Sequence, residues 1–219
     1  MKASRPDRAP ASSSTLPARP EQRREEILDR AIDLFAANGF ADTDLQVLAD
    51  DLGIGKGTLY RHFGNKEKLF LAAADRVMEK LRVHVDQAVA AITDPLESIT
   101  RGIGAYLEFF NEYPAAVEML IQERAHFKDR KRPTYFEHRE TNIVRWRAIY
   151  RDLINQGRLR PLSVERMSDT IGDLLYGTMF VAYIAGRRMQ PAQAAAEIID
   201  IVFHGILTDR ERQGRPAKD

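Results

Sequence analysis

Between positions 56 and 62 the chain concentrates side chains that can donate hydrogen bonds. These side chains are Lys56, Thr58, Tyr60, Arg61 and His62. Amino, guanidinium, hydroxyl and imidazole groups bind phosphate oxygens and the acceptor atoms on the edges of bases. Acidic residues precede this stretch and lysines follow it at positions 66 and 68, so positive charge gathers on one short segment. The net charge of +1 says nothing about partners, but this distribution predicts a surface that binds nucleic acid.

Two short helices joined by a glycine turn are predicted to position these donors. Over 45–52 the apolar residues follow the spacing of one buried helix face: Leu45, Leu48, Ala49 and Leu52. Gly53 ends this helix, since glycine accepts the left-handed conformation found at helix C-termini. Residues 57–63 form the second helix, which Gly64 closes. The pair predicts a helix-turn-helix whose second helix enters a DNA major groove.

Two flanking helices complete a three-helix head and lead out of it. A first helix begins near Pro20 and ends at Gly39, with an apolar face that includes Ile27 and Phe35. Thr43 and Gln46 have the spacing of a capping box for the helix over 45–52. Asn65 is a suitable N-cap for a long helix over 66–91, which would connect the head to the rest of the chain.

The remaining sequence predicts five more helices and no strand. Asp94 and Pro95 start a helix over 95–112, and a second helix follows over 114–126. After a basic loop at 128–133 come helices over 134–156, from Ser163 to 188, and over 191–207. No segment shows sustained period-2 alternation, so we expect an all-α protein of about nine helices.

We expect four segments along the chain. Residues 1–19 form a disordered arm, residues 20–66 a DNA-binding domain, residues 67–208 a ligand-binding and dimerisation domain, and residues 209–219 a flexible tail. The arm is either a basic segment that attracts phosphate weakly or a tail without a role.

Composition excludes several classes of function. The chain has no cysteine, which excludes disulfides and thiolate chemistry and fits a reducing cytoplasm. It has no apolar window of about 18 residues and no signal-peptide core, so we expect a cytoplasmic protein without a membrane span. It also lacks a glycine-rich phosphate loop and a nucleophile elbow, so we expect neither catalysis nor a cofactor.

Residues 23–69 resemble the DNA-binding domain of TetR-family transcriptional regulators. The resemblance rests on Phe35, Gly39, Leu48-Ala49, Gly53, the run from Lys56 to Phe63, and Lys66-Glu67-x-Leu69. It implies a homodimer that binds a palindromic DNA operator, usually as a repressor, until a small molecule binds the C-terminal domain. The positions that the resemblance assigns to DNA contact are Thr43, Gln46, Lys56, Gly57, Thr58, Tyr60, Arg61, His62 and Lys66.

Two residues depart from the family pattern. Asp44 occupies a position where Ser or Thr commonly contacts phosphate, and its carboxylate either repels DNA or caps the second helix in place of Thr43. Gly55 occupies a position where Ser often caps the third helix. An alternative function follows from them: a helical small-molecule binding protein whose head binds DNA weakly or not at all. A same-fold activator is the other alternative.

The last two long helices are expected to pair with their mates in the homodimer, as the resemblance implies. They combine small and apolar residues, a composition that permits close approach between helices. The residues assigned to this interface are Ile171, Leu175, Met179, Ala182, Ile198, Ile201, Val202 and Gly205. The alternative is that these side chains fill the core of the monomer.

A pocket for an apolar or aromatic effector is expected between helices four and eight. Its predicted lining is Phe109, Phe110, Tyr113, Met119, Gln122, Phe127, Arg139, Trp146, Tyr150, Asp173, Tyr176 and Phe180. Aromatic residues at helical spacing are also ordinary core residues, so each assignment competes with simple packing. A zinc site built from Glu123, His126, Glu137, His138 and Glu140 is the less favoured alternative.

Overall fold

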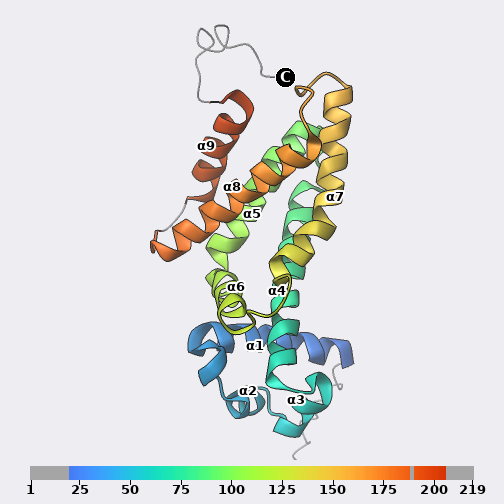
Figure 1. Ribbon diagram of the computed structural model, residues 1–219. Coiled ribbons are helices and arrows are strands. Elements are labelled where there is room, and N and C mark those ends of the chain that lie inside the picture. The colour runs from blue at the N-terminus through green and yellow to red at the C-terminus, as the bar shows by residue number, and fades with distance from the viewer. Residues whose placement is uncertain (1–19, 188–189, 206–219) are drawn as a thin grey trace, which may run out of the picture.

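The computed structural model describes residues 20–187 and 190–205, and helices account for all the regular structure in these ranges. They are α1 (Pro20–Asp42), α2 (Leu45–Asp51), α3 (Lys56–Phe63), α4 (Lys66–Val89), α5 (Pro95–Glu112), α6 (Pro114–His126), α7 (Thr134–Asn155), α8 (Val164–Ile184) and α9 (Pro191–His204). The all-α prediction is confirmed. Figure 1 shows α1 to α3 at one end of an elongated molecule, with α4 leading from them into the other helices. Among the described residues, no helix is long and apolar enough to cross a membrane.

The helix ends follow local chemistry, with one correction in the head. Asp44 is the N-cap of α2, and its side chain accepts a hydrogen bond from the Gln46 amide at 2.8 Å. The capping box predicted for Thr43 is therefore wrong. Thr43 is buried instead, and its hydroxyl donates to the Gly39 carbonyl at 2.6 Å. Gly39 has a φ of 83° that breaks the helical path of α1, as predicted for this glycine.

The other predicted caps are confirmed. Asn65, Asp94 and Ser163 cap α4, α5 and α8 through hydrogen bonds that their side chains accept from backbone amides. Gly55 precedes α3 without a side-chain cap, also as expected.

Three predicted helices end two or more residues earlier than the sequence pattern indicated. α4 ends at Val89, two residues early. α8 ends at Ile184 because Gly186, with a φ of 59°, takes the left-handed conformation that terminates helices. α9 ends at His204, just before Gly205 with a φ of 73°. The predicted ends at residues 188 and 207, the arm over 1–19 and the tail over 209–219 lie outside the described residues.

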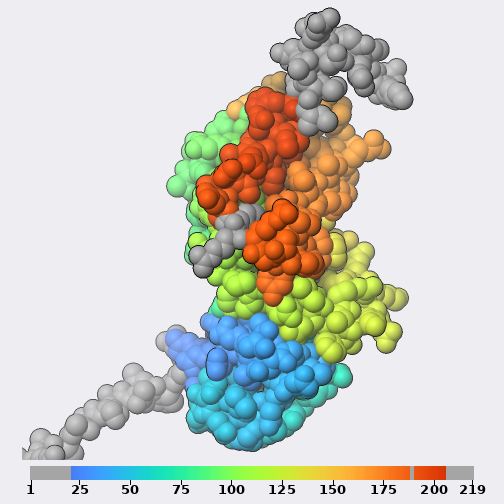
Figure 2. All heavy atoms as spheres, turned by 90° about the vertical axis from the view of Figure 1, so that its left-hand side faces the viewer, coloured from blue at the N-terminus to red at the C-terminus, as the bar shows by residue number. Residues whose placement is uncertain are grey.

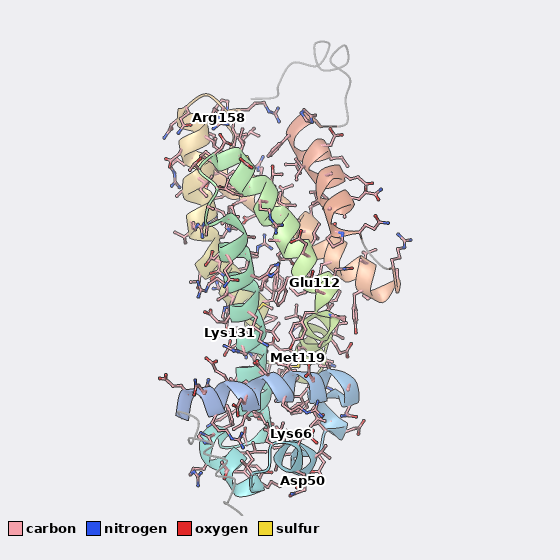
Figure 3. All side chains as sticks on the ribbon, turned by 180° about the vertical axis from the view of Figure 1, so that it is seen from behind. Asp50, Lys66, Glu112, Met119, Lys131 and Arg158 are labelled. Carbon is pink, nitrogen blue, oxygen red and sulfur yellow. The ribbon has the colours of Figure 1, made fainter. Side chains whose placement is uncertain are left out.

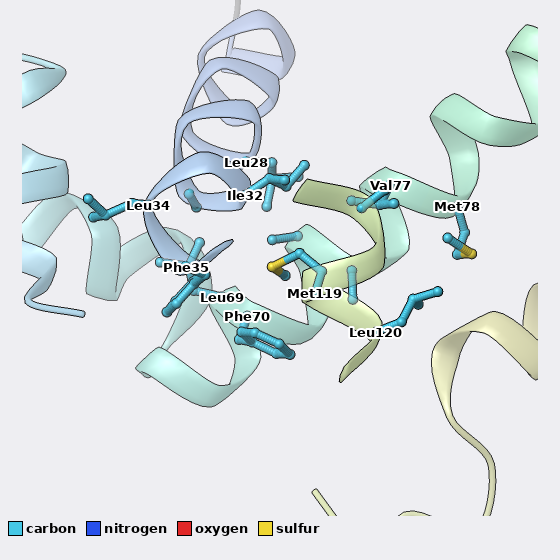
Figure 4. Packing of buried hydrophobic residues seen from close by; sticks show 14 of the residues in the cluster. Leu28, Ile32, Leu34, Phe35, Leu69, Phe70, Val77, Met78, Met119 and Leu120 are labelled. Carbon is cyan, nitrogen blue, oxygen red and sulfur yellow. The ribbon is translucent and has the colours of Figure 1, made fainter. Parts of the chain in front are cut away.

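Two hydrophobic cores hold the molecule together. The first joins the head to the body, because Met119 of α6 packs among residues of α1 and α4 such as Phe35 and Phe70 (Figure 4). The second core joins α5, α7, α8 and α9 around Leu107 and Leu153. Because the first core crosses from the head into α6, the head is not packed as a separate unit. A domain boundary near residue 66 stays a prediction.

Candidate DNA-binding surface and ligand cavity

The donors of α3 face outward because the helix is anchored on its opposite side. Leu59 and Phe63 are buried in the first core, one helical turn apart. Tyr60, Arg61 and His62 are exposed at the far end of the molecule, which Figure 2 shows as a rounded surface formed by the first helices. No acidic residue lies on α3 itself. The arrangement presents cationic and hydroxyl groups on a short helix that can fit into a major groove.

The carboxylate of Asp44 forms an ion pair with a lysine of α3. It accepts from the Lys56 ammonium at 3.1 Å as well as from the Gln46 amide. The hydrogen bond from the Gln46 amide lowers the pKa of Asp44 most, and the contact with Lys56 lowers it further. The Asp44 side chain therefore stays ionised. Lys56 is thus held by a carboxylate with which a phosphate would have to compete.

Two predicted DNA contacts also brace the end of α1. The Lys66 ammonium donates to the Ala41 carbonyl at 2.9 Å and lies 5.2 Å from the centre of the Phe40 ring. Thr43 uses its hydroxyl within the same turn. Lys66 is labelled in Figure 3, where it lies beside α1. Both side chains therefore stabilise the head, and their contact with DNA stays a prediction.

A cavity of about 360 Å³ lies between α4, α5, α7 and α8. Its wall is mainly apolar and aromatic, and it includes Arg139, Trp146 and Tyr150 from the predicted set. The sequence reasoning missed the contribution of α4 and α5: Met78, Leu81, Val85, Ile99, Ile103 and Tyr106. Their helical spacing marked them only as buried, and nothing local distinguishes a core residue from a cavity residue.

The charged groups at the cavity are paired with neighbours. Arg82 contacts Glu79 and Asp86, and Arg145 contacts Asp86 at 2.6 Å. Arg139 donates to Asp173 at 2.7 Å across the gap between α7 and α8. These pairs leave an interior suited to an apolar molecule.

Two tyrosines, Tyr135 buried and Tyr106 partly buried, form a hydrogen bond in the cavity wall. The hydroxyls of Tyr106 and Tyr135 are 3.0 Å apart. Burial raises the pKa of Tyr135 to about 12, so the phenol stays neutral.

Comparison with known proteins finds relatives of the head and of the whole fold. The family model described as bacterial regulatory proteins, tetR family, matches residues 27–73. The HTH-type transcriptional repressor KstR2 of Mycolicibacterium smegmatis is 28% identical over 192 residues, covering 87% of this chain and 93% of that protein. Residues 27–73 thus match the DNA-binding domain of the TetR family, and the chain is similar to a TetR-type regulator over most of its length. The relatives found by these comparisons are transcriptional regulators and not enzymes.

Solved structures of the family share the whole architecture. PfmR from Thermus thermophilus is 26% identical with a TM-score of 0.65, over 83% of this chain and 99% of that one. FadR from Bacillus subtilis, solved in complex with stearoyl-CoA, shares the fold with a TM-score of 0.71 at 16% identity, over 83% and 98% of the two chains. The TetR fold thus extends through the helices that form the cavity.

Most of the other predicted ligand residues lie outside this cavity. Side chains that pack in the first core or against it are Phe109, Phe110, Tyr113, Met119, Gln122, Phe127 and Phe180. Asp173 is exposed and reaches the cavity only through its ion pair with Arg139. Tyr176 lines a second cavity, of about 340 Å³, beside α6. Aromatic residues at helical spacing mostly form core in this chain.

Gln122 and Glu123 are buried for structural reasons. The Gln122 amide donates to the Phe35 carbonyl of the head at 2.9 Å. The Glu123 carboxylate accepts from the backbone amide and the hydroxyl of Thr134, both at 2.9 Å, and so caps α7 from outside. Within the described ranges no three carboxylate or imidazole groups are grouped to hold a metal, which removes the support for the zinc alternative.

The predicted dimer residues divide between the inside and the outside of the protomer. Ile171, Leu175, Met179 and Ile198 are buried within one chain, Ala182 and Val202 are partly buried, and Ile201 and Gly205 are exposed. Four apolar side chains remain exposed on the outer faces of these helices: Leu174, Val181, Ile184 and Ile201. The exposed face of α8 differs from the predicted one, since Val181 lies two positions after the buried Met179, about 200° further around a helix of about 3.6 residues per turn.

Proposed function

We propose that the protein is a homodimeric repressor that binds a palindromic operator and is released by a small apolar or aromatic effector. The observation that carries the proposal is the outward face of α3, where Arg61, His62 and Tyr60 are exposed opposite a buried anchor. Repression is taken from the relative KstR2, which is named a transcriptional repressor.

The homodimer is supported by the apolar stripe on the outer face of α8. Leu174, Val181 and Ile184 follow the three- and seven-residue spacing of one helix face, and the last two side chains are 59% and 71% exposed. Contiguous exposed apolar side chains indicate a protein interface. We infer that a second copy of the chain covers this stripe together with Ile201 of α9. Of the residues assigned from sequence, Ile201, Gly205, Ala182 and Val202 remain suited to this interface.

The effector site is proposed to be the cavity between α4, α5, α7 and α8. α4 forms one wall of this cavity through Met78 and Val85, and it begins at Lys66 in the head. A ligand that moves α4 can therefore change the position of the head. We propose that this displacement separates the two α3 helices of the dimer from their half-sites.

Operator binding by the purified protein tests the proposal. We expect a specific mobility shift with the promoter region of its own gene, and an affinity that falls steeply as salt rises. Arg61→Ala should reduce binding by about tenfold or more, because a bidentate arginine contact to a base contributes about 1–3 kcal/mol. Arg151→Ala, on the exposed surface of α7, is the matched control and should bind like the parent protein.

The same experiment separates the alternative function. A protein that is folded and dimeric by sedimentation but shifts no operator contradicts the repressor proposal. An Arg61→Ala variant that binds like the parent protein favours a small-molecule binding protein whose head no longer reads DNA.

A further inference from the structure

Three side chains form one stripe of α7 along the cavity. Asn142, Trp146 and Tyr150 are each four residues apart, which places them on neighbouring turns of the same side of the helix. All three line the cavity. From Asn142 to Tyr150 the helix rises by about 12 Å, at about 1.5 Å per residue. A molecule lying along this stripe would meet an amide, an indole and a phenol in turn.

The deep end of the stripe carries an unused hydrogen-bonding group. Tyr150 is only 5% exposed, and its hydroxyl has no hydrogen-bond partner among the described residues. Burial raises the pKa of Tyr150 to about 12, so its hydroxyl remains a neutral donor and acceptor. The fully buried side-chain atoms without a partner among the described residues belong to His84, Gln122 and Glu123, so the Tyr150 hydroxyl is accessible from the cavity that it lines. The hydroxyl is therefore poised for a partner inside the cavity.

The outer end of the stripe has a second unused group. Asn142 is half-buried, and in the described part of the chain its side-chain amide forms no hydrogen bond. Its neighbours Thr141 and Arg145 are exposed, so Asn142 marks the opening of the cavity. The charged side chains near Asn142 are not free in this way, because Arg139 and Arg145 each form an ion pair with a carboxylate. The unpaired groups at the two ends of the stripe, the Asn142 amide and the Tyr150 hydroxyl, are both neutral.

Between the two ends Trp146 forms an aromatic surface. Its indole lies on Gly102 of α5, where an added Cβ would come within 2.6 Å of the ring. The absence of a side chain at Gly102 thus leaves room for the end of the indole ring against α5. An aromatic ring stacks on such a surface more favourably than its buried area alone would give.

We propose that the effector is an elongated, uncharged, mainly apolar or aromatic molecule with a hydrogen-bonding oxygen at each end. One oxygen bonds to the Tyr150 hydroxyl at the closed end, the body stacks on Trp146, and the other oxygen bonds to the Asn142 amide at the opening. This ligand class rests on the proposed function, because it specifies the effector for the cavity named there.

Fluorescence titration of the full chain tests the proposal without DNA. Trp146 is the single tryptophan, so its emission reports on this cavity alone. The probes are 4,4′-dihydroxybiphenyl, 4-hydroxybiphenyl and biphenyl, which share one rigid body and differ in the number of terminal oxygens. We expect affinity to fall in that order. Each neutral hydrogen bond should change the dissociation constant by about two- to tenfold.

Variants assign each oxygen to its partner. Tyr150→Phe and Asn142→Leu should each weaken 4,4′-dihydroxybiphenyl by about two- to tenfold and leave biphenyl unchanged. The matched control is Tyr113→Phe, which also removes a hydroxyl but lies outside the cavity wall. It should not change the affinity of any probe. Thermal unfolding of all three variants checks that they remain folded.

Several results would overturn the proposal. These are equal affinity for the three probes, no change in Trp146 emission with any of them, or a Tyr113→Phe variant that behaves like Tyr150→Phe. Tighter binding of biphenyl-4-carboxylate than of 4-hydroxybiphenyl would contradict an uncharged effector. Failure of the repressor proposal looks different: the probes bind in the expected order, but the protein shifts no operator.

Discussion

The head and the cavity show two ways of building a site from helices. The exposed donors of α3 come from one short run of sequence, and Leu59 and Phe63 within that run set its orientation. The cavity instead takes its wall from four helices, with residues as far apart as Met78 and Leu175. Local spacing is enough for the first site. The second depends on how long helices cross, which no single segment encodes.

The two regions are nevertheless joined by one core. Phe35 of α1 contacts Phe70 of α4 edge to face, with ring centres 5.1 Å apart, and Met119 of α6 lies in the same cluster. The Gln122 amide adds a hydrogen bond from α6 to the Phe35 carbonyl. A change at the cavity can therefore reach the head through packed side chains and not only through the backbone of α4.

The largest expected effect tests this shared core. Phe35 is fully buried, and Phe35→Ala should lower the free energy of unfolding by about 3–5 kcal/mol. Because the core includes α4 and α6, helix content by circular dichroism and Trp146 fluorescence should shift together in denaturant. Val144→Ala, at a 66% exposed position of α7, is the control and should change stability by less than about 0.5 kcal/mol. An early transition seen by circular dichroism alone would mean that the head unfolds independently.

An intermediate effect concerns the cavity and should leave the head unaffected. Gly102→Ala brings a Cβ within 2.6 Å of Trp146 and should cost about 1–3 kcal/mol as the indole is displaced. Trp146 emission and biphenyl affinity should both change, while operator affinity without ligand stays the same. Gly104→Ala on the same helix is the control, because its nearest neighbour is a flexible arginine end at 3.4 Å. Equal effects of the two substitutions would show that the Trp146 contact is not the cause.

The smallest expected effect concerns the carboxylate beside α3. Asp44→Asn keeps an N-cap for α2 but removes the charge that holds Lys56. Operator affinity should rise by about two- to fivefold, and its logarithmic dependence on salt should steepen by about one unit. Asp200→Asn, at an exposed position of α9, is the control. A weaker-binding Asp44→Asn variant would show that the carboxylate helps to orient Lys56 on DNA.

The helix caps were predictable because their signals are short-range. The caps at Asn65 and Asp94 each act within one turn of helix, and both agree with the structure. The one error, at Thr43, arose because two adjacent residues could cap α2 and only the position of the Gly39 carbonyl decided between them. Lys66 illustrates the same limit, since its partner Ala41 is 25 positions away.

In the body, residue type was a poor guide to role. Phe109, Phe110 and Met119 have the composition of a ligand pocket, but they fill the core next to the head. Leu81 and Val85 have the composition of a core, but they line the cavity. The same holds on α8, where Met179 is buried and Ile184 exposed although both are apolar.

The sequence by itself determined the helices, their caps and the donors on α3, since these follow from hydrogen bonds and periodicity between near neighbours. The tertiary structure alone decided which apolar faces meet, where about 360 Å³ is left unfilled, and that Tyr150 lines this cavity. The physical reason is that hydrophobic burial is not directional. Hydrophobic burial requires an apolar face to be covered but does not specify which face covers it. The angles at which the helices cross decide which faces meet.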